Sequence, residues 1–181
     1  LLPFFDIQSY IKEWFFKMNI ETKNLWKKSA SEILALIDKK EILIEEVLES
    51  SLNRIKEINP DINAVVTLIN DDEKKRLINN FDNITDSILK GMPVLIKDMN
   101  DVKDMRTTYG SKLYADHFPK KSDIVVQTIE KNGGLIIGKT NIPEFAAGSH
   151  TYNSIFGLTK NPWNTLLSAG GSSGGAAAAL A

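Results

Sequence analysis

Two pairs of glycines around two serines, followed directly by a run of alanines, are the most restrictive feature of this sequence. The tract runs from Ser168 to Gly175, and the alanines begin at Ala176. Glycine lets a backbone approach a ligand closely, whereas alanine is the strongest helix former. The pattern predicts a tight loop that leads into a helix, whose N-terminal N–H groups point at an anion or a developing oxyanion. An ordinary loop with a serine helix cap is the simpler interpretation.

Composition narrows the chemistry that this chain can support. The 181 residues carry 22 Lys and Arg against 23 Asp and Glu, and this balance gives no broad electrostatic case for nucleic-acid binding. Cysteine is absent, which excludes disulfides, thiolate metal sites and a cysteine nucleophile. His117 and His150 are too few for a multi-histidine metal site. We therefore expect no metal and no cofactor, and catalysis by hydroxyls, lysines, carboxylates or backbone dipoles.

The first half of the chain is predicted to be mainly helical. Apolar spacing indicates a short helix around residues 33–37, which Ser31 can cap, and a second helix over residues 44–58. Asn59-Pro60 is expected to close the second helix, because the residue before a proline leaves the α region. A short strand over residues 64–69 and a polar helix over residues 72–81 follow.

Helices and strands alternate in the second half. Residues 93–96 and 134–138 form apolar runs typical of buried strands, and a helix over residues 123–132 lies between them and ends at Gly133. We expect an α/β fold: N-terminal helices followed by part of a mixed sheet covered by helices.

The opening stretch, residues 1–20, is rich in Leu, Phe and Ile. Ile7, Ile11, Trp14 and Met18 fall on one helical face, which favours an amphipathic helix packed on the protein or an extension foreign to the domain. Charged residues interrupt the apolar run and no small-residue cleavage pattern follows, so we expect neither a signal peptide nor a membrane span. A membrane-surface helix is the less favoured alternative, and we expect a cytoplasmic location.

Residues Gly133–Thr140 match the phosphate-loop pattern G-x-x-x-x-G-K-[ST]. A nucleotide-binding protein is therefore an alternative from another functional class. The context argues against it, because the expected helix precedes Gly133 and apolar strand residues fill the middle of the motif. Such residues do not form a nest of backbone N–H groups around a phosphate.

Lys97 and Asp98 stand at the end of the predicted strand over residues 93–96. A lysine at such a place is usually solvated or paired, and Asp98 is an obvious partner. The alternative is a lysine removed from water, where burial favours the neutral amine. A neutral lysine can serve as a general base.

Four ordered segments together resemble the N-terminal part of an amidase signature enzyme. They are Gly91–Asp98, Gly134–Phe145, Asn153–Trp163 and the glycine-serine tract with its alanines. The resemblance is dense from about residue 89 onward. It implies that residues 25–181 are the N-terminal portion of an amidase signature domain, an incomplete amidase signature fold, and that residues 1–24 are an N-terminal extension.

The resemblance implies hydrolysis of carboxylic amides by a serine–cis-serine–lysine triad. Lys97 corresponds to the lysine base. Ser172 corresponds to the middle serine, and the peptide bond that joins it to Gly171 is expected to be cis, which places the hydroxyl between Lys97 and the nucleophile. Ser173 corresponds to a supporting hydrogen-bonding serine. Ala146 corresponds to a residue whose backbone contacts the substrate.

The nucleophilic serine of the family lies further along than Ser172, in a second glycine-rich stretch that has no counterpart before Ala181. We therefore expect an N-terminal fragment that is inactive by this mechanism and folds poorly alone, because its sheet would have open edges. The expected partner is a small-molecule amide. A glutaminase-type amidotransferase subunit for tRNA-dependent amide formation is the alternative within the family, and only this alternative involves nucleic acid. A non-catalytic module that kept the motif is a third interpretation.

Overall fold

A computed structural model describes residues 24–79 and 87–181 of the protein. The helices of this part are α2 (Ala30–Asp38), α3 (Ile44–Ile62), α4 (Asp71–Asn79), α5 (Ile124–Lys131) and α6 (Gly174–Leu180), with short 3₁₀ turns η1 (Leu25–Lys27), η3 (Lys112–Tyr114) and η4 (Glu144–Ala146). The strands are β1 (Val65–Leu68), β2 (Pro93–Lys97), β3 (Leu135–Thr140), β4 (Tyr152–Asn153), β5 (Gly157–Leu158), β6 (Lys160–Asn161) and β7 (Asn164–Ser168). The expected α/β class is confirmed.

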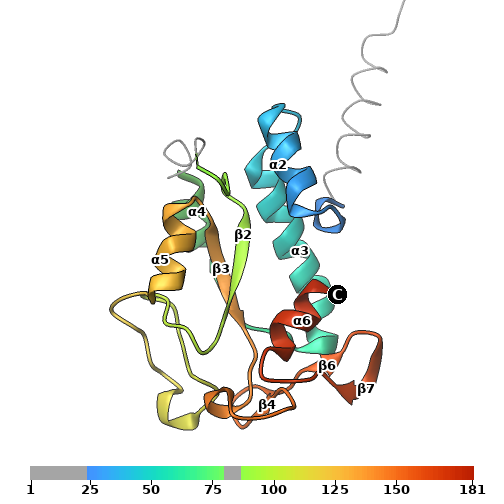
Figure 1. Cartoon of the computed structure of the whole chain (residues 1–181), viewed down its shortest axis with the longest axis vertical. Coiled ribbons are helices and arrows are strands. Elements are labelled where there is room, and N and C mark those ends of the chain that lie inside the picture. Colours follow the sequence, from blue (N-terminus) through green and yellow to red (C-terminus); the bar gives the residue numbers. More distant parts are fainter. Residues whose placement is uncertain (1–23, 80–86) are drawn as a thin grey trace, which may run out of the picture.

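The central sheet has the strand order β1-β3-β2, and Figure 1 shows β2 and β3 side by side. Strand β3 is buried along its whole length, pairs in parallel with β2 and pairs antiparallel with β1. The sheet is therefore mixed, as expected. Two small two-stranded sheets, β4-β5 and β6-β7, follow β3 in the chain and lead to α6.

The two faces of the central sheet bury different apolar clusters. On one face, Ile96 and Ile136 belong to a cluster with Val126 of α5. On the other face, Ile137 clusters with Leu48 of α3. Figure 1 shows α5 on one side of the sheet and α3 with α6 on the other, so we name these the α5 face and the α3 face. Burial of each such side chain contributes about 1.5–3 kcal/mol to folding.

A bulge interrupts the pairing of β2 with β3. Val94 pairs with Ile136, but the next residue, Leu95, pairs with Gly138, and Ile137 is skipped. An extra residue on one strand of a pair reverses the facing of the side chains that follow it on that strand. The bulge therefore decides which side chains beyond residue 138 reach each face.

The residues after the bulge divide between the two faces. Lys139 pairs with Ile96, and paired residues share a face, so Lys139 lies on the α5 face. Thr140 pairs with Lys97, and both point to the α3 face. Without the bulge, Lys139 would share the face of Ile137 and α6.

The N-cap of helix α2 lies two residues before Ser31, where the cap was expected. Ser29 is the N-cap: its Oγ accepts the N–H of Glu32 at 3.3 Å, and the Glu32 carboxylate accepts the N–H of Ser29 at 2.8 Å. This reciprocal capping box needs a glutamate three residues after the cap, which Ser29 has and Ser31 lacks. The assignment of the cap to Ser31 was wrong for this reason.

Helix α3 continues through Pro60 to Ile62, so the end expected at Asn59-Pro60 was wrong. The helix stops at Asn63, which has a left-handed φ of 51° and donates its N–H to the carbonyl of Asn59 at 2.7 Å. The side chain of Asn59 also accepts the N–H of Val65 at 2.7 Å. The first bond satisfies one carbonyl of the last turn, and the second ties the end of the helix to β1.

The expected amphipathic helix in residues 1–20 lies outside the described residues, and so does the expected end of the polar helix at Phe81. Leu25 is 1% exposed and clusters with Ile33, Ile44 and Val47. The first residues that the structure describes are therefore already part of the core, and the domain boundary after residue 24 remains a prediction. No helix in residues 24–79 and 87–181 is long and apolar enough to cross a bilayer.

Candidate active site

The side chains of Lys97 and Ser172 meet at the C-terminal end of β2. Nζ of Lys97 donates to Oγ of Ser172 at 2.7 Å and to Oγ of Ser173 at 2.9 Å. Both serines lie in the loop that joins β7 to α6. Lys97 and Ser172 are half-buried, whereas Ser173 is exposed. An amine in contact with two hydroxyls gives a short path along which a proton can move.

The peptide bond between Gly171 and Ser172 is cis. The backbone of the preceding loop passes close to it: the N–H of Gly171 donates to the carbonyl of Ser149 at 2.7 Å. A Cβ on Gly171 would lie 2.7 Å from the carbonyl oxygen of Gly148. The glycine is therefore needed for the loop of residues 148–150 to support the turn that presents Ser172.

Thr151 holds both sides of the serine loop, a role that the sequence did not indicate. Its Oγ1 donates to the carbonyl of Gly170 at 2.9 Å and accepts the N–H of Gly174 at 3.0 Å. Its own N–H donates to the carbonyl of Ala169 at 3.1 Å. Thr151 is completely buried, so these bonds form without competition from water.

Helix α6 is anchored directly to the end of β3. The N–H of Gly175 donates to the carbonyl of Asn141 at 3.2 Å, and the N–H of Asn141 donates to the carbonyl of Ala64 at 2.9 Å. A Cβ on Gly175 would lie 2.4 Å from the nitrogen of Asn141. This close approach explains why a glycine, rather than another alanine, stands at the second position of the helix.

Asp98 pairs with Lys139 and not with Lys97, which had been its expected partner. Asp98 Oδ1 lies 3.3 Å from Nζ of Lys139, and both side chains are almost inaccessible to water. Successive strand residues point to opposite faces, so Lys97 and Asp98 are directed apart. Burial lowers the pKa of Lys139, while the carboxylate of Asp98 opposes that shift.

Residues 133–140, the match to the phosphate-loop pattern, do not form a loop. Residues Leu135–Thr140 are strand β3, and the Lys139 side chain is fully buried. A phosphate therefore has no access to this lysine, which agrees with the context argument from the sequence. Among residues 24–79 and 87–181, no three His, Cys, Asp or Glu side chains are grouped so that they could hold a metal ion.

Ala146 lies in η4, after Phe145, and both residues have left-handed φ values of 56° and 50°. The N–H of Phe145 donates to the carbonyl of Tyr109 at 2.7 Å, and its ring packs edge-on against Tyr114 at 6.2 Å. Burial, together with a hydrogen bond to Asp101, raises the pKa of Tyr109. These contacts fix the η4 backbone, but in the described structure they do not join Ala146 to Lys97 or Ser172.

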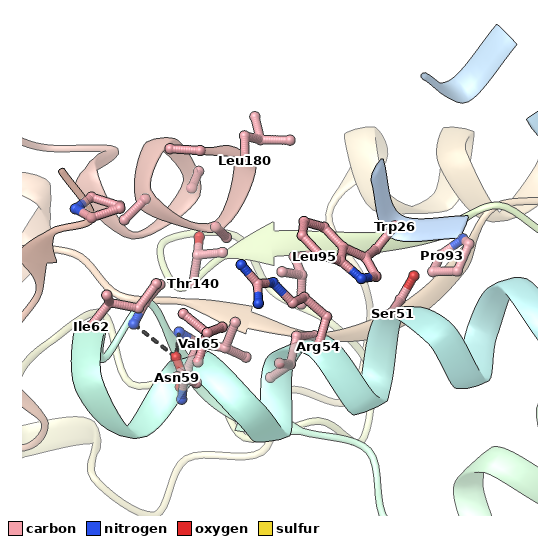
Figure 2. A pocket seen from close by; sticks show the side chains of 18 of the residues that line it. Trp26, Ser51, Arg54, Asn59, Ile62, Val65, Pro93, Leu95, Thr140 and Leu180 are labelled. Carbon is pink, nitrogen blue, oxygen red and sulfur yellow. Dashed lines mark hydrogen bonds between the residues drawn. The ribbon is translucent and has the colours of Figure 1, made fainter. Parts of the chain in front are cut away.

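A groove of about 960 Å³ lies on the α3 face of the sheet, apart from this site. Its walls come from α3, β2 and α6, and Figure 2 shows Trp26 and Arg54 next to each other among the lining side chains. The guanidinium of Arg54 stacks on the Trp26 ring with 3.9 Å between its Cζ and the ring centroid. Lys97, Ser172 and Ser173 do not line it.

The family model described as Amidase matches residues 46–181. One subunit of a glutamyl-tRNA(Gln) amidotransferase of Clostridium acetobutylicum is 40% identical over 165 residues, which cover 87% of this chain and 33% of that protein. The chain thus spans about a third of the length of the curated relatives that it matches.

Two solved structures are also similar to this chain in sequence and in fold. A 6-aminohexanoate cyclic dimer hydrolase, solved with its substrate, is 30% identical with a TM-score of 0.76, over 87% of this chain and 33% of that one. A bacterial aryl acylamidase of the amidase signature family is 33% identical with a TM-score of 0.75, over 83% of this chain and 32% of that one.

Proposed function

The chain belongs to the amidase signature family, and on that premise we propose that the whole protein cleaves the carbon–nitrogen bond of linear carboxylic amides by acyl transfer. The observation that carries this proposal is the contact between Nζ of Lys97 and Oγ of Ser172 at 2.7 Å. This distance lies within the range in which a general base takes a proton.

Lys97 is the base and Ser172 is the relay. The neutral amine of Lys97 takes the Ser172 hydroxyl proton while Ser172 takes the proton of the nucleophilic serine. The nucleophile attacks the amide carbonyl, and backbone N–H groups stabilise the oxyanion. The protons return along the same path to the leaving nitrogen, which departs as ammonia or an amine. Water then hydrolyses the acyl-enzyme.

The supporting residues have narrower roles in this scheme. Ser173 holds the Lys97 amine from a second side, at 2.9 Å. Gly171 provides the space in which the serine loop turns. Ala146 contributes a backbone contact to the substrate. Lys97 and Ser172 are two of the three members of the proposed triad, and the third is its nucleophilic serine.

Substitution of the base and of the relay serine in the whole protein tests the proposal. We expect Lys97→Ala and Ser172→Ala each to lower kcat for release of ammonia from simple amides by at least about a hundredfold. Lys103→Ala is the matched control, because the Lys103 side chain is 63% exposed and pairs with the neighbouring Asp104. Wild-type rates in both Lys97→Ala and Ser172→Ala would exclude the mechanism.

A glutamine-dependent amidotransferase subunit is the second candidate. It is favoured by the relative from C. acetobutylicum, whose identity of 40% exceeds the 30–33% of the two hydrolase structures. Ammonia release from glutamine, compared with release from a panel of simple amides, separates the two functions. Glutaminase activity that rises with partner proteins and aminoacylated tRNA supports this candidate, whereas equal activity on simple amides without partners supports a general amidase.

A further inference from the structure

A buried ionic cluster lies directly behind the proposed base, on the opposite face of the sheet. Its members are the side chains of Asp98, Lys139, Thr107 and Thr108, all of them residues with no accessible surface. Nζ of Lys139 lies 3.3 Å from Oδ1 of Asp98 and donates to Oγ1 of Thr107 at 2.6 Å. Oγ1 of Thr108 donates to Oδ2 of Asp98 at 2.6 Å. Each charge thus lies beside the opposite charge and has a threonine hydroxyl as a hydrogen-bond partner.

A buried ion pair such as Lys139–Asp98 contributes little net stability to a fold. Desolvation of two ions offsets much of their attraction, and well-packed apolar residues of similar volume often serve as well or better. Lys139 reaches the cluster only because the bulge at Ile137 and Gly138 turns it to the α5 face. A Cβ on Gly138 would lie 2.4 Å from the carbonyl oxygen of Thr67, so the bulge also requires this glycine.

The contacts of Lys139 converge on the turn that follows Lys97. The carbonyl of Lys97 accepts the N–H of Asn100 at 3.0 Å and closes this turn. Nζ of Lys139 donates to the carbonyl of Asn100 at 2.8 Å and pairs with Asp98, so it grips two of the three residues after Lys97. The N–H of Asp98 donates to the carbonyl of Thr140 at 3.1 Å and extends the ladder past the end of β2.

We infer that the Lys139–Asp98 pair positions Lys97. The pair fixes the turn after β2, so that the Lys97 side chain extends from the α3 face of the sheet toward Ser172. The inference rests on the proposed function of Lys97 as the base. A lysine has a flexible stem, and its amine stays within 2.7 Å of Ser172 only if its backbone is fixed. Displacement of a catalytic group by about 1 Å can cost on the order of a hundredfold in rate.

The test uses the whole protein with the variants Lys139→Met, Asp98→Asn and the double variant that carries both. Each single variant leaves one charge buried without its partner, whereas the double variant is neutral and is expected to fold. We expect the double variant to lower kcat by between about tenfold and a hundredfold, with KM unchanged within about twofold. Lys90→Met is the control, because Lys90 pairs with Asp38 before the other end of β2 and water reaches both of these side chains.

Milder variants keep the test valid if the double variant does not fold. Thr107→Val removes the hydroxyl that accepts from Lys139, whereas Thr107→Ser keeps it. We expect kcat to fall several-fold in Thr107→Val and to be restored in Thr107→Ser, with KM constant in both. Equal rates in the two variants would contradict the inference.

A crystal structure of the double variant provides a readout that does not depend on activity. We expect Nζ of Lys97 to move beyond hydrogen-bond reach of Oγ of Ser172, about 3.2 Å. Suppose that Lys97→Ala is inactive, as the proposed function requires. An unchanged 2.7 Å contact in the double variant, together with wild-type kcat, would then overturn the positioning role of the Lys139–Asp98 pair. Wild-type activity in Lys97→Ala would instead overturn the proposed function, and the distance in the crystal would still decide the positioning.

Discussion

Lys97 and Ser172 are 75 positions apart in the chain, yet their side chains meet at 2.7 Å. Both are held by the C-terminal end of β3. Lys97 pairs with Thr140, the last residue of that strand, and the next residue, Asn141, accepts the N–H of Gly175. One buried strand therefore sets the distance between the proposed base and the serine loop.

Ser173 contributes less to the rate than Ser172. Its hydroxyl touches Nζ of Lys97 at 2.9 Å but is exposed, so in Ser173→Ala water can replace it. A net hydrogen bond is worth about 0.5–1.5 kcal/mol, which corresponds to a loss in kcat of about tenfold or less. Steady-state amide hydrolysis by the whole protein measures this loss beside the larger one of Ser172→Ala. A loss in Ser173→Ala equal to that in Ser172→Ala would assign the relay to both serines.

Gly175→Ala is expected to destabilise the protein by about 1–3 kcal/mol, because the added Cβ would overlap the backbone of Asn141 at 2.4 Å. Urea denaturation measures the change. Gly170→Ala is the matched control in the same loop: its Cβ would have 4.0 Å of space from the carbonyl of Ser149, and we expect a change within about 0.5 kcal/mol. Equal effects of the two alanines would show that close packing at Gly175 is unimportant.

The sequence predicted the order of strands and helices because the apolar runs are distinct and well separated. Residues 93–96 and 134–138 were expected as strands, and β2 and β3 contain nearly all of them. The ends of the helices were harder to predict. Ser29 and Ser31 are both potential caps, and only the spacing from Ser29 to Glu32 distinguishes them.

The candidate site was predictable only in part. Lys97 and Ser172 stood out because a strand-end lysine and a glycine-serine loop are unusual together, and the family resemblance connected them. The partner of Asp98 was not predictable, because the bulge that turns Lys139 to its face arises from the pairing of β2 with β3. Thr151 gave no signal at all, since a lone threonine between polar residues has no pattern.

Ser29→Ala is expected to cost about 1 kcal/mol of folding free energy, because it removes the side-chain half of the capping box with Glu32. Ser31→Ala is the matched control: Ser31 is exposed in the first turn of α2, where Ser29 already occupies the cap position. Urea denaturation of both variants checks the assignment. A larger loss in Ser31→Ala would return the cap to Ser31.

Lys139 is expected to make stability rise with pH in alkaline solution. Burial lowers its pKa in the folded protein below the ordinary value of 10.5, while Asp98 opposes the shift. At a pH between the lowered pKa of Lys139 in the folded protein and its ordinary pKa, the unfolded chain holds more protons than the folded one. The free energy of unfolding therefore increases as pH rises through this range. One proton limits the slope to about 1.4 kcal/mol per pH unit.

Urea denaturation from about pH 7 to pH 10, with Lys139→Met subtracted from wild type, isolates this contribution. Tyr109 has the opposite effect, because its raised pKa makes the unfolded chain lose the proton first, but that loss begins only near the ordinary tyrosine value of 10.0. The exposed Lys131 provides the control Lys131→Met, which is expected to leave the slope of the wild type unchanged. A difference between wild type and Lys139→Met that falls with pH would mean that the ammonium form of Lys139 is favoured by folding, with attraction to Asp98 outweighing burial.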